Sequence, residues 1–484
     1  MDTVRWLPWS SDAFARARAE GRPVLLSIAA PWCESCLEMD RTTYADPGVA
    51  GIVNDRFVPI RVNPDRRPDI SDRYSLGGWP TTAFLTAEGE VIGGGTYVAV
   101  DRMPSVLERV AEAFRSRREE LTAVRRDPEA SRSDGGAASV DVAAVVFDAF
   151  DAEHGGFGTA PKFPLTAPLE LALDLYRETE DPAMAHLVEV TLDAMGWGGL
   201  YDEVDGGFFR CAATRDWQQP HREKLLDVNA SLLRIYVEAS ETLRIARYRE
   251  RAGEVLRYAQ TWLADPVDGA WAGSQQADRD YYAATLEGRR AGTAPKVDGV
   301  LYAAWNAQMV SATLRAAELL DDTALGEFAL KSLERIVVAC YSPGAGIAHC
   351  LDGRPSVRGL LDDQIAMAAA HLDAHAATGN IVYEMMAQEL AHYAVRTMWD
   401  EQHGGFFDRS VPEAAERVGL MGERLKPFVA NCEAARVLRR LAGIKGDHSF
   451  GDQAEATLAT IAPLAPQQGP LAAHYLLALR QPIG

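Results

Sequence analysis

Two cysteines separated by two residues carry the strongest chemical signal in this sequence. Cys33 and Cys36 lie in the segment APWCESCLEMD (30–40), directly after an apolar, strand-like run (23–30) and at the start of a predicted helix. Unpaired backbone N–H groups and the helix dipole favour a thiolate at a helix N-terminus. We therefore expect Cys33 to be the nucleophile of a redox pair. Cys36, one turn along, is placed to resolve the mixed disulfide that Cys33 forms.

Trp32 and Pro80 are expected to complete this site. Trp32 directly precedes the pair and would shield it from solvent. Pro80 follows Cys36 by 44 residues in the segment GGWPT (77–81), just before a predicted hairpin. If the Trp79–Pro80 peptide bond is cis, the backbone of Trp79 turns towards the cysteines, where an extended substrate could pair.

A zinc half-site is the structural alternative for the two cysteines. Zinc would need two further ligands, and the first 153 residues contain neither a histidine nor a second pair of this kind. We therefore favour redox chemistry that uses no metal and no other cofactor. Cysteines that have lost their activity are the other alternative.

The composition is that of a globular protein in a reducing compartment. The net charge of −20 disfavours binding to nucleic acid or to an acidic membrane surface. The first 20 residues lack the apolar core of a secretory signal, and no window approaches 18 consecutive apolar residues, so we expect no membrane partner. A cytoplasmic location is expected because the other cysteines are too scattered for a disulfide framework: Cys211, Cys340, Cys350 and Cys432.

The elements that must position the redox pair lie within residues 1–125. Apolar runs predict strands at 23–30 and 57–62 and a hairpin over 81–94. Helices are expected at 34–44, 47–56, 68–74 and 102–125. Residues 126–139 are rich in Ser, Gly and Asp and lose all periodicity, which predicts a linker.

Residues 140–484 are predicted to be almost entirely helical, and one short motif recurs in them. Clear copies are DAEHGGF (151–157), DEVDGGF (202–208) and DEQHGGF (400–406), with weaker ones at 265–271 and 341–347. We expect the glycines to form a turn, the Phe to pack beneath it and the Asp to cap a helix. The length suits six helical hairpins that close into a ring, and an open superhelix is the alternative.

Polar residues near these motifs are candidates for the mouth of such a ring, although a solvated rim with ordinary helix caps would look the same. A glycosidase would need two carboxylates facing each other, and a sugar epimerase an acid and a base. His371 and His375 could share a metal, but packing within an alanine-rich helix is favoured. The candidates are Lys162, Tyr201, Asp202, Asp205, Arg210, His221, Glu223, Lys224, Asp227, Asn229, Trp305, Asn306, Asp362 and Asp363.

Several segments resemble the family of thioredoxin-domain proteins that includes the spermatogenesis-associated thioredoxin-like proteins. The resemblance implies a multidomain chain, α/β plus all-α. A thioredoxin-like fold would occupy residues 1–125, and an (α/α)6 barrel similar to six-hairpin glycosidases and sugar epimerases would occupy residues 140–484. The segments lie at 46–54, 57–69, 77–85, 94–97, 155–164, 221–226 and 304–306.

The sequence departs from this family at the redox segment. The family usually has a histidine after each cysteine, where this chain has Glu34 and Leu37. Its His-Phe-Glu-Lys-Met segment is HREKL (221–225) here, and the chain is shorter than typical members. Ordinary thioredoxins also carry a buried Asp that helps to deprotonate the resolving thiol, at the position of Ser27. Glu34 or Glu38 could replace it, or their charges could raise the thiol pKa values and slow attack.

Three functions are compatible with these observations. The first is a thiol–disulfide oxidoreductase that acts on a protein or small-molecule thiol or disulfide. The second is a sugar epimerase, isomerase or glycoside hydrolase that binds a carbohydrate in the barrel, with a regulatory thioredoxin-like domain. The third is a non-catalytic interaction scaffold. We favour the first because the Cys33–Cys36 motif has a defined chemical mechanism.

Overall fold

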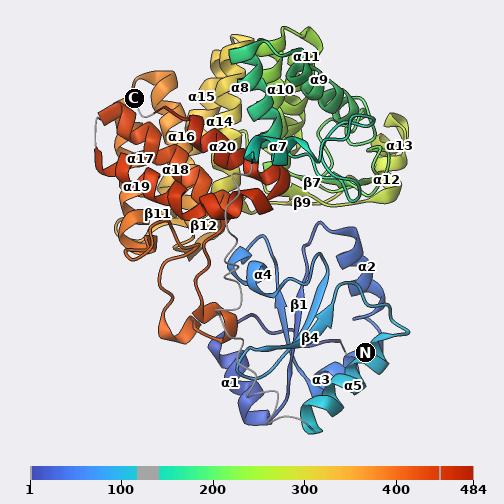
Figure 1. Ribbon diagram of the computed structural model, residues 1–484. Coiled ribbons are helices and arrows are strands. Elements are labelled where there is room, and N and C mark those ends of the chain that lie inside the picture. Colours follow the sequence, from blue (N-terminus) through green and yellow to red (C-terminus); the bar gives the residue numbers. More distant parts are fainter. Residues whose placement is uncertain (1–2, 117–140, 446–447, 483–484) are drawn as a thin grey trace. The chain divides into compact units, whose positions relative to one another are not determined.

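The computed structural model describes residues 3–116, 141–445 and 448–482 and divides into two compact units (Figure 1). The first comprises Met1–Ala138 together with Val411–Arg424, and the second comprises Ser139–Ser410 together with Leu425–Gly484. The predicted linker at 126–139 and the end of the predicted helix at 102–125 lie outside the described residues.

The first unit has a thioredoxin-like fold, as predicted. Its four-stranded sheet has the order β2-β1-β3-β4, in which β1 runs parallel to β2 and antiparallel to β3. The strands are β1 (Val24–Ile28), β2 (Val58–Val62), β3 (Thr81–Leu85) and β4 (Val91–Gly95). The helices are α1 (Ser11–Glu20), α2 (Glu34–Thr42), α3 (Pro47–Arg56), α4 (Pro68–Tyr74) and α5 (Met103–Ser116).

The alternation of side chains along β1 explains why helices cover both faces of this sheet. Every residue of β1 is buried, and successive side chains of a strand point to opposite faces. Leu26 packs in one core with Phe14 of α1 and Ile70 of α4. Leu25 packs in another with residues of α2, α3 and α5. The strand that ends just before the cysteines is therefore held from both sides.

The segment 411–424 belongs to the first unit, although it is far from that unit in sequence. Met421 is buried in the core beside α1 and α4. The Tyr74 hydroxyl accepts a hydrogen bond from the Leu420 N–H at 2.9 Å and donates one to the Gly89 carbonyl at 2.9 Å. Gly419 has φ +55°, and a Cβ there would lie 2.5 Å from the Tyr74 hydroxyl. This discontinuity was not predicted, because the sequence of a 14-residue segment of this kind does not differ from that of an ordinary surface loop. Its 3-10 turns are η2 (Ala414–Glu416) and η3 (Gly419–Gly422).

The second unit is a closed (α/α)6 barrel, and the open superhelix is excluded. Its inner helices contact one another in the order α8-α10-α14-α16-α18-α20, and α20 returns to α8 (Figure 1). The inner helices are α8 (Ala167–Thr179), α10 (Leu226–Leu243), α14 (Ala303–Leu320), α16 (Leu361–Thr378), α18 (Phe428–Lys445) and α20 (Ala473–Arg480). Their outer partners are α9 (Pro182–Gly196), α11 (Ala246–Tyr258), α15 (Thr323–Cys340), α17 (Ile381–Met398), α19 (His448–Ile461) and, against α20, α7 (Val142–Phe147).

Short elements fill the connections of the barrel. The strands are β5 (Cys211–Ala212), β6 (Pro220–His221), β7 (Lys224–Leu225), β8 (Ser274–Gln275), β9 (Val297–Asp298), β10 (Leu301–Tyr302), β11 (Tyr341–Ser342), β12 (Gly346–Asp352) and β13 (Arg354–Arg358). The short helices are α12 (Arg279–Ala283), α13 (Leu286–Ala291), the π-helical η1 (Ala259–Leu263), and the 3-10 segments η4 (Ala462–Gln467) and η5 (Gly469–Ala472).

The recurring Asp…Gly-Gly-Phe motif forms a turn before five of the six inner helices, α8, α10, α14, α16 and α18. Both glycines have positive φ in the three clear copies. The Asp carboxylate accepts N–H groups of its own turn, as Asp151 does from Glu153 and His154, so it caps a turn and not a helix. The aromatic residue packs in the core, as expected: Phe157, Phe208, Trp271 and Phe406 are all buried.

An amide side chain in the first turn of each of four inner helices clamps the last residue of the preceding motif copy. The Oδ1 atom of Asn306 accepts the Trp271 N–H at 2.8 Å, while its Nδ2 donates to the carbonyls of Trp271 and Tyr302, both at 3.0 Å. Asn229, Asn431 and Gln364 make the same paired contact with residues 208, 406 and 347. Asn306 and Asn229, predicted for the mouth of the ring, are instead fully buried in this clamp.

We predict that Asn306→Ala lowers the stability of the barrel by about 2–4 kcal/mol, because it leaves a buried N–H and a buried carbonyl of Trp271 without partners. Thermal unfolding of the whole chain would measure the loss. Gln308→Ala is the matched control, since Gln308 lies on the same helix and faces the cavity. A melting temperature that stays at the wild-type value in Asn306→Ala would contradict the role of the clamp.

Candidate functional site

The two cysteines meet at the start of α2. Cys33 is the N-cap of this helix, and its Sγ accepts the backbone N–H of Cys36 at 3.3 Å. The Sγ atoms of Cys33 and Cys36 are 2.7 Å apart, and no disulfide joins them. Cys33 is 5% exposed and Cys36 is 2% exposed, so Cys33 is the more accessible of the two to a partner. The helix start therefore brings together the two residues that the motif predicted.

The hydrogen bonding gives the two sulfurs different chemistry. The Cys36 thiol donates a hydrogen bond to Cys33 Sγ, and this bond together with burial raises the pKa of Cys36. A thiol that donates in this way stabilises the thiolate that accepts. The backbone N–H of Cys36 adds a second donor to the same sulfur. The arrangement suits a thiolate at Cys33 and a protonated thiol at Cys36.

Two tryptophans and a cis proline line the approach to Cys33. The Trp79–Pro80 peptide bond is cis, and the Trp79 carbonyl oxygen lies 3.9 Å from Cys33 Sγ. The Trp32 ring packs edge-on against Trp79 with centroids 5.5 Å apart, and its indole N–H donates to Asp65 at 2.5 Å. Both residues predicted to complete the site, Trp32 and Pro80, therefore lie beside it.

The acidic residues on α2 have different surroundings. Glu38 is exposed and accepts a hydrogen bond from the Tyr97 hydroxyl at 3.2 Å. Asp40 forms a two-bond ion pair with Arg61 of β2. Sequence reasoning considered Glu34 and Glu38 but missed Asp40. Its position four residues after Cys36 was the available signal, because residues four apart share a face of a helix.

Most of the polar residues predicted for the barrel mouth form buried structural ion pairs. Lys162 is 0% exposed and bonds Asp151 at 2.7 Å. Lys224 is likewise buried and bonds Asp202 at 2.7 Å, and Arg289 bonds both Asp202 and Asp205 at 2.7 Å. Burial lowers the pKa of Lys224 to about 8 despite the attraction of Asp202. Each of these pairs joins the acidic residues of one motif turn to a cation from outside the motif.

The remaining predicted residues lie in separate places. Tyr201 is buried beneath the Arg251 guanidinium, whose Cζ is 3.6 Å from its ring centroid. Asp363 is buried and pairs with His349 Nδ1 at 3.0 Å. His221 lies on β6 opposite Cys211.

Arg210 and Glu223 form an ion pair at 2.6 Å close to Asp227, at the start of α10. Burial raises the pKa of Asp227 to about 6. A carboxyl that titrates near neutral pH could transfer protons, but it does not line the central cavity of the barrel.

A cavity of about 380 Å³ lies among the inner helices, near their N-terminal ends. Of the predicted residues, only Trp305 and Asp362 line it. Sequence reasoning missed its other ionisable residues because, on an amphipathic helix, polar residues that face a cavity look like a solvent-exposed face. These include Glu170, Arg234, Glu433, Arg436 and His474.

The ionisable residues of this cavity form one network. Arg436 bonds Glu170 at 2.6 Å and lies 3.4 Å from Glu433, while His474 Nδ1 lies 2.8 Å from Glu433. Burial raises the pKa of Glu433, but Arg436 and His474 outweigh it and lower the value to about 2. Opposite charges and hydrogen-bonding groups thus surround this space of about 380 Å³, and Trp305 adds an aromatic wall.

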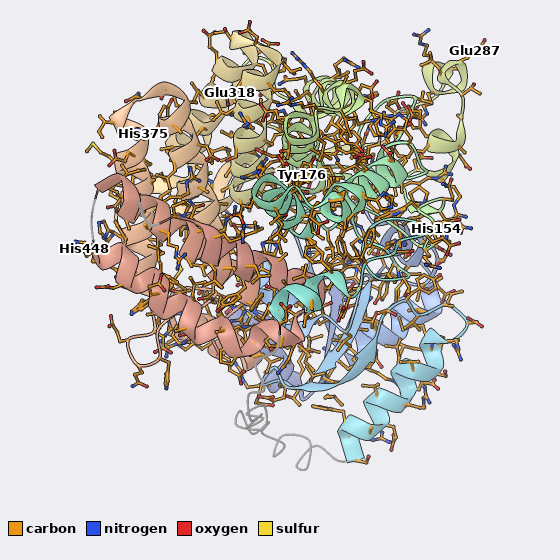
Figure 2. The ribbon with its side chains drawn as sticks, turned by 45° about the horizontal axis from the view of Figure 1, so that its top comes forward. His154, Tyr176, Glu287, Glu318, His375 and His448 are labelled. Atoms are coloured by element: carbon orange, nitrogen blue, oxygen red, sulfur yellow. The ribbon has the colours of Figure 1, made fainter. Side chains whose placement is uncertain are left out.

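The pair His371 and His375 does not form a metal site. His371 Nδ1 contacts the Met367 carbonyl at 2.7 Å, and burial lowers its pKa to about 4. His375, labelled in Figure 2, contacts the Asn380 carbonyl at 3.0 Å. Throughout the described ranges, no three His, Cys, Asp or Glu side chains are grouped so that they could hold a metal ion. Among the described helices, none has the length and apolar character needed to cross a membrane.

The first unit matches known thiol–disulfide proteins in sequence. Residues 1–130 match the family model Thioredox_DsbH, described as a protein of unknown function, DUF255. The thiol:disulfide interchange protein DsbD of Ralstonia nicotianae is 40% identical over 81 residues, which are 16% of this chain and 13% of that protein.

A longer similarity runs through both units. Human spermatogenesis-associated protein 20 is 25% identical over 595 residues, covering 93% of this chain and 75% of that protein. An uncharacterised protein of Caenorhabditis elegans is 29% identical over 262 residues, 48% of this chain but only 36% of that protein. These matches confirm the resemblance to the spermatogenesis-associated thioredoxin-like proteins.

Solved structures with the fold of the second unit include carbohydrate enzymes. Cellobiose 2-epimerase from Bacillus thermoamylovorans superposes with a TM-score of 0.54 at 11% identity, covering 66% of this chain and 83% of the enzyme. A family 76 glycoside hydrolase (mannosidase) from Bacteroides thetaiotaomicron gives a TM-score of 0.51 at 10% identity, covering 70% and 96%. At this identity the likeness establishes the fold alone.

We predict that Asp227→Asn stabilises the protein by about 3 kcal/mol at pH 7.5. Folding raises the pKa of Asp227 from 3.8 to about 6, so the folded state favours the neutral carboxyl and this group lowers stability as the pH rises towards 6. Asparagine mimics the neutral form. Chemical denaturation at pH 7.5 and 5 should show a gain that is smaller at pH 5. The exposed Asp268→Asn is the control, and a gain that is equal at both pH values would contradict the prediction.

Proposed function

We propose that the protein is a thiol–disulfide oxidoreductase in which Cys33 attacks and Cys36 resolves. The observation that carries this proposal is the position of Cys33 Sγ at the N-terminus of α2, where it accepts hydrogen bonds from both the backbone and the thiol of Cys36. The neighbouring cis peptide bond places the Trp79 carbonyl beside that sulfur, where an extended client could pair. The similarity of this unit to an interchange protein gives independent support.

The reaction consists of two exchanges. The Cys33 thiolate attacks one sulfur of a client disulfide, forming a Cys33–client disulfide and releasing the other client sulfur as a thiolate. Cys36 then loses its proton and attacks Cys33 Sγ. This step forms the Cys33–Cys36 disulfide and releases the second client thiolate. The client is reduced by two electrons and the cysteine pair is oxidised by two, and the reverse sequence would oxidise a dithiol client.

A second candidate function concerns the cavity of the barrel. Its charged network, its size and the Trp305 wall suit a neutral polyhydroxylated ligand, because such ligands use many hydrogen bonds and an apolar ring face. Glu170 and Glu433 are the carboxylates available for acid–base chemistry, with His474 beside Glu433. The carbohydrate enzymes that share this fold support the ligand class by analogy alone.

The wild type should accelerate the reduction of insulin by dithiothreitol, which is followed as turbidity. We predict that Cys33→Ser abolishes this acceleration, because the attacking thiolate is gone. Cys36→Ser should also lose turnover, but it should accumulate a mixed disulfide with the client that non-reducing electrophoresis detects. Cys211→Ser removes a buried cysteine far from the pair in sequence and should keep wild-type activity. Wild-type rates in Cys33→Ser would refute the redox proposal.

For the second candidate, we predict that a panel of free monosaccharides and disaccharides contains a sugar that raises the melting temperature of the wild type. Trp305→Ala and Glu433→Gln should reduce this shift, since both residues line the cavity. Asp268→Asn, on an exposed turn, should leave it unchanged. The carbohydrate hypothesis fails if no sugar shifts the wild type, or if the shift survives both cavity substitutions.

A further inference from the structure

We propose that Asp40, held by Arg61, accepts the proton that Cys36 loses when it attacks the mixed disulfide. This inference rests on the proposed redox function and assigns the base for its second step. It replaces Glu34 and Glu38, the acids that the sequence suggested for this role. Three observations support it: the chemical state of Cys36, the position of Asp40 and the surroundings of the Arg61 guanidinium.

Cys36 needs a base. Its hydrogen bond to Cys33 and its burial both favour the protonated thiol, and the nearby charge of Asp40 acts in the same direction. Only the thiolate attacks a disulfide, so the second exchange requires removal of this proton inside the protein. Ser27, which is 1% exposed in the middle of β1, has no carboxylate to supply for this purpose.

Asp40 is on the same face of α2 as Cys36, one turn further along. Its two carboxylate oxygens accept hydrogen bonds from both terminal nitrogens of Arg61. Arg61 lies on β2 directly opposite Ser27 of β1. The ion pair therefore joins the helix that carries the resolving cysteine to the strand position that faces Ser27. A carboxylate is present in this corner, but α2 supplies it and β1 does not.

The position of Arg61 is itself fixed by packing. Its guanidinium carbon lies 4.2 Å from the ring centroid of Trp6 and 5.5 Å from that of Tyr44. The Tyr44 hydroxyl contacts Thr82 at 3.3 Å and bonds Ser27, so β1 and β3 close the same corner. Two aromatic rings thus hold the cation that holds Asp40.

The other ionisable groups around Cys36 are less suited to be its base. Cys33 is consumed in the mixed disulfide at this stage. Tyr44 is fully buried, and burial raises its pKa. Glu38 is directed to the surface, where it accepts the Tyr97 hydroxyl. The Asp40 side chain is 35% exposed, which lets it pass the proton on to solvent after each turnover.

The step balances without an added reagent. The Asp40 carboxylate takes the proton from the Cys36 thiol, and the Cys36 sulfur forms a bond with Cys33 Sγ. The bond between Cys33 and the client sulfur breaks, and its electron pair leaves with the client thiolate. The neutral Asp40 then releases its proton to water or to that thiolate, which restores the ion pair with Arg61.

The test uses 5,5′-dithiobis(2-nitrobenzoate) with the reduced full-length protein, because each exchange releases one coloured thiolate. The first phase reports attack by Cys33 and the second reports attack by Cys36. Asp40→Asn should slow the second phase by about tenfold or more and leave the first phase within about twofold. Glu38→Gln is the matched control on the same helix and should change neither phase.

A second variant keeps the test decisive if loss of the ion pair loosens the fold. Ser27→Asp combined with Asp40→Asn returns a carboxylate to the strand position opposite Arg61 and should restore the fast second phase. A wild-type second phase in Asp40→Asn overturns the inference, as does slowing of both phases without rescue. Failure of the redox proposal itself would give a different result, because the wild type would then lack the first phase.

Discussion

The hydrogen bond from the backbone N–H of Cys36 to Cys33 Sγ is the interaction around which the first unit is built. It exists because β1 ends at Ile28 and α2 begins at Glu34, so that Cys33 is left at the N-cap. Helices on both faces hold β1, and the loop before β3 brings the Trp79 carbonyl to the same sulfur. Moving the helix start by one residue would separate the sulfur from its donor.

The barrel depends on a different constraint, which is the need to satisfy backbone groups at the turns between outer and inner helices. Asn229, Asn306, Gln364 and Asn431 each close one turn with a paired hydrogen bond. Lys162, Lys224 and Lys426 neutralise the Asp of their turns. Buried polar groups require hydrogen-bond partners, so the turns determine which residue types can occupy these positions. The ionisable residues that face the cavity instead pair with one another around it.

Most elements of the first unit were predictable, because they follow from local apolar patterns, although α1 was missed. For the second unit, the repeated motif and the length favoured a closed ring but left an open superhelix as the alternative. The redox pair was predictable because its two cysteines lie close together in the sequence. The cavity was not, since Glu170, Arg234 and Glu433 come from three separate helices and converge only when the ring closes. Lys162 and Lys224 were assigned to the mouth because sequence does not distinguish a buried lysine with a partner from an exposed one. Asp40 was overlooked because its partner Arg61 lies on another element.

Neither unit is a continuous stretch of chain, and this affects its synthesis on the ribosome. Met421 fills part of the core beside α1 and α4, so the N-terminal unit emerges early but lacks a piece of its interior until residues 411–424 follow. The ring likewise stays open until α20 has been made and reaches α8. Both units therefore need residues from beyond position 410, and until these are made the first unit has a defect in its core. A fragment cut at residue 125 would keep this defect permanently.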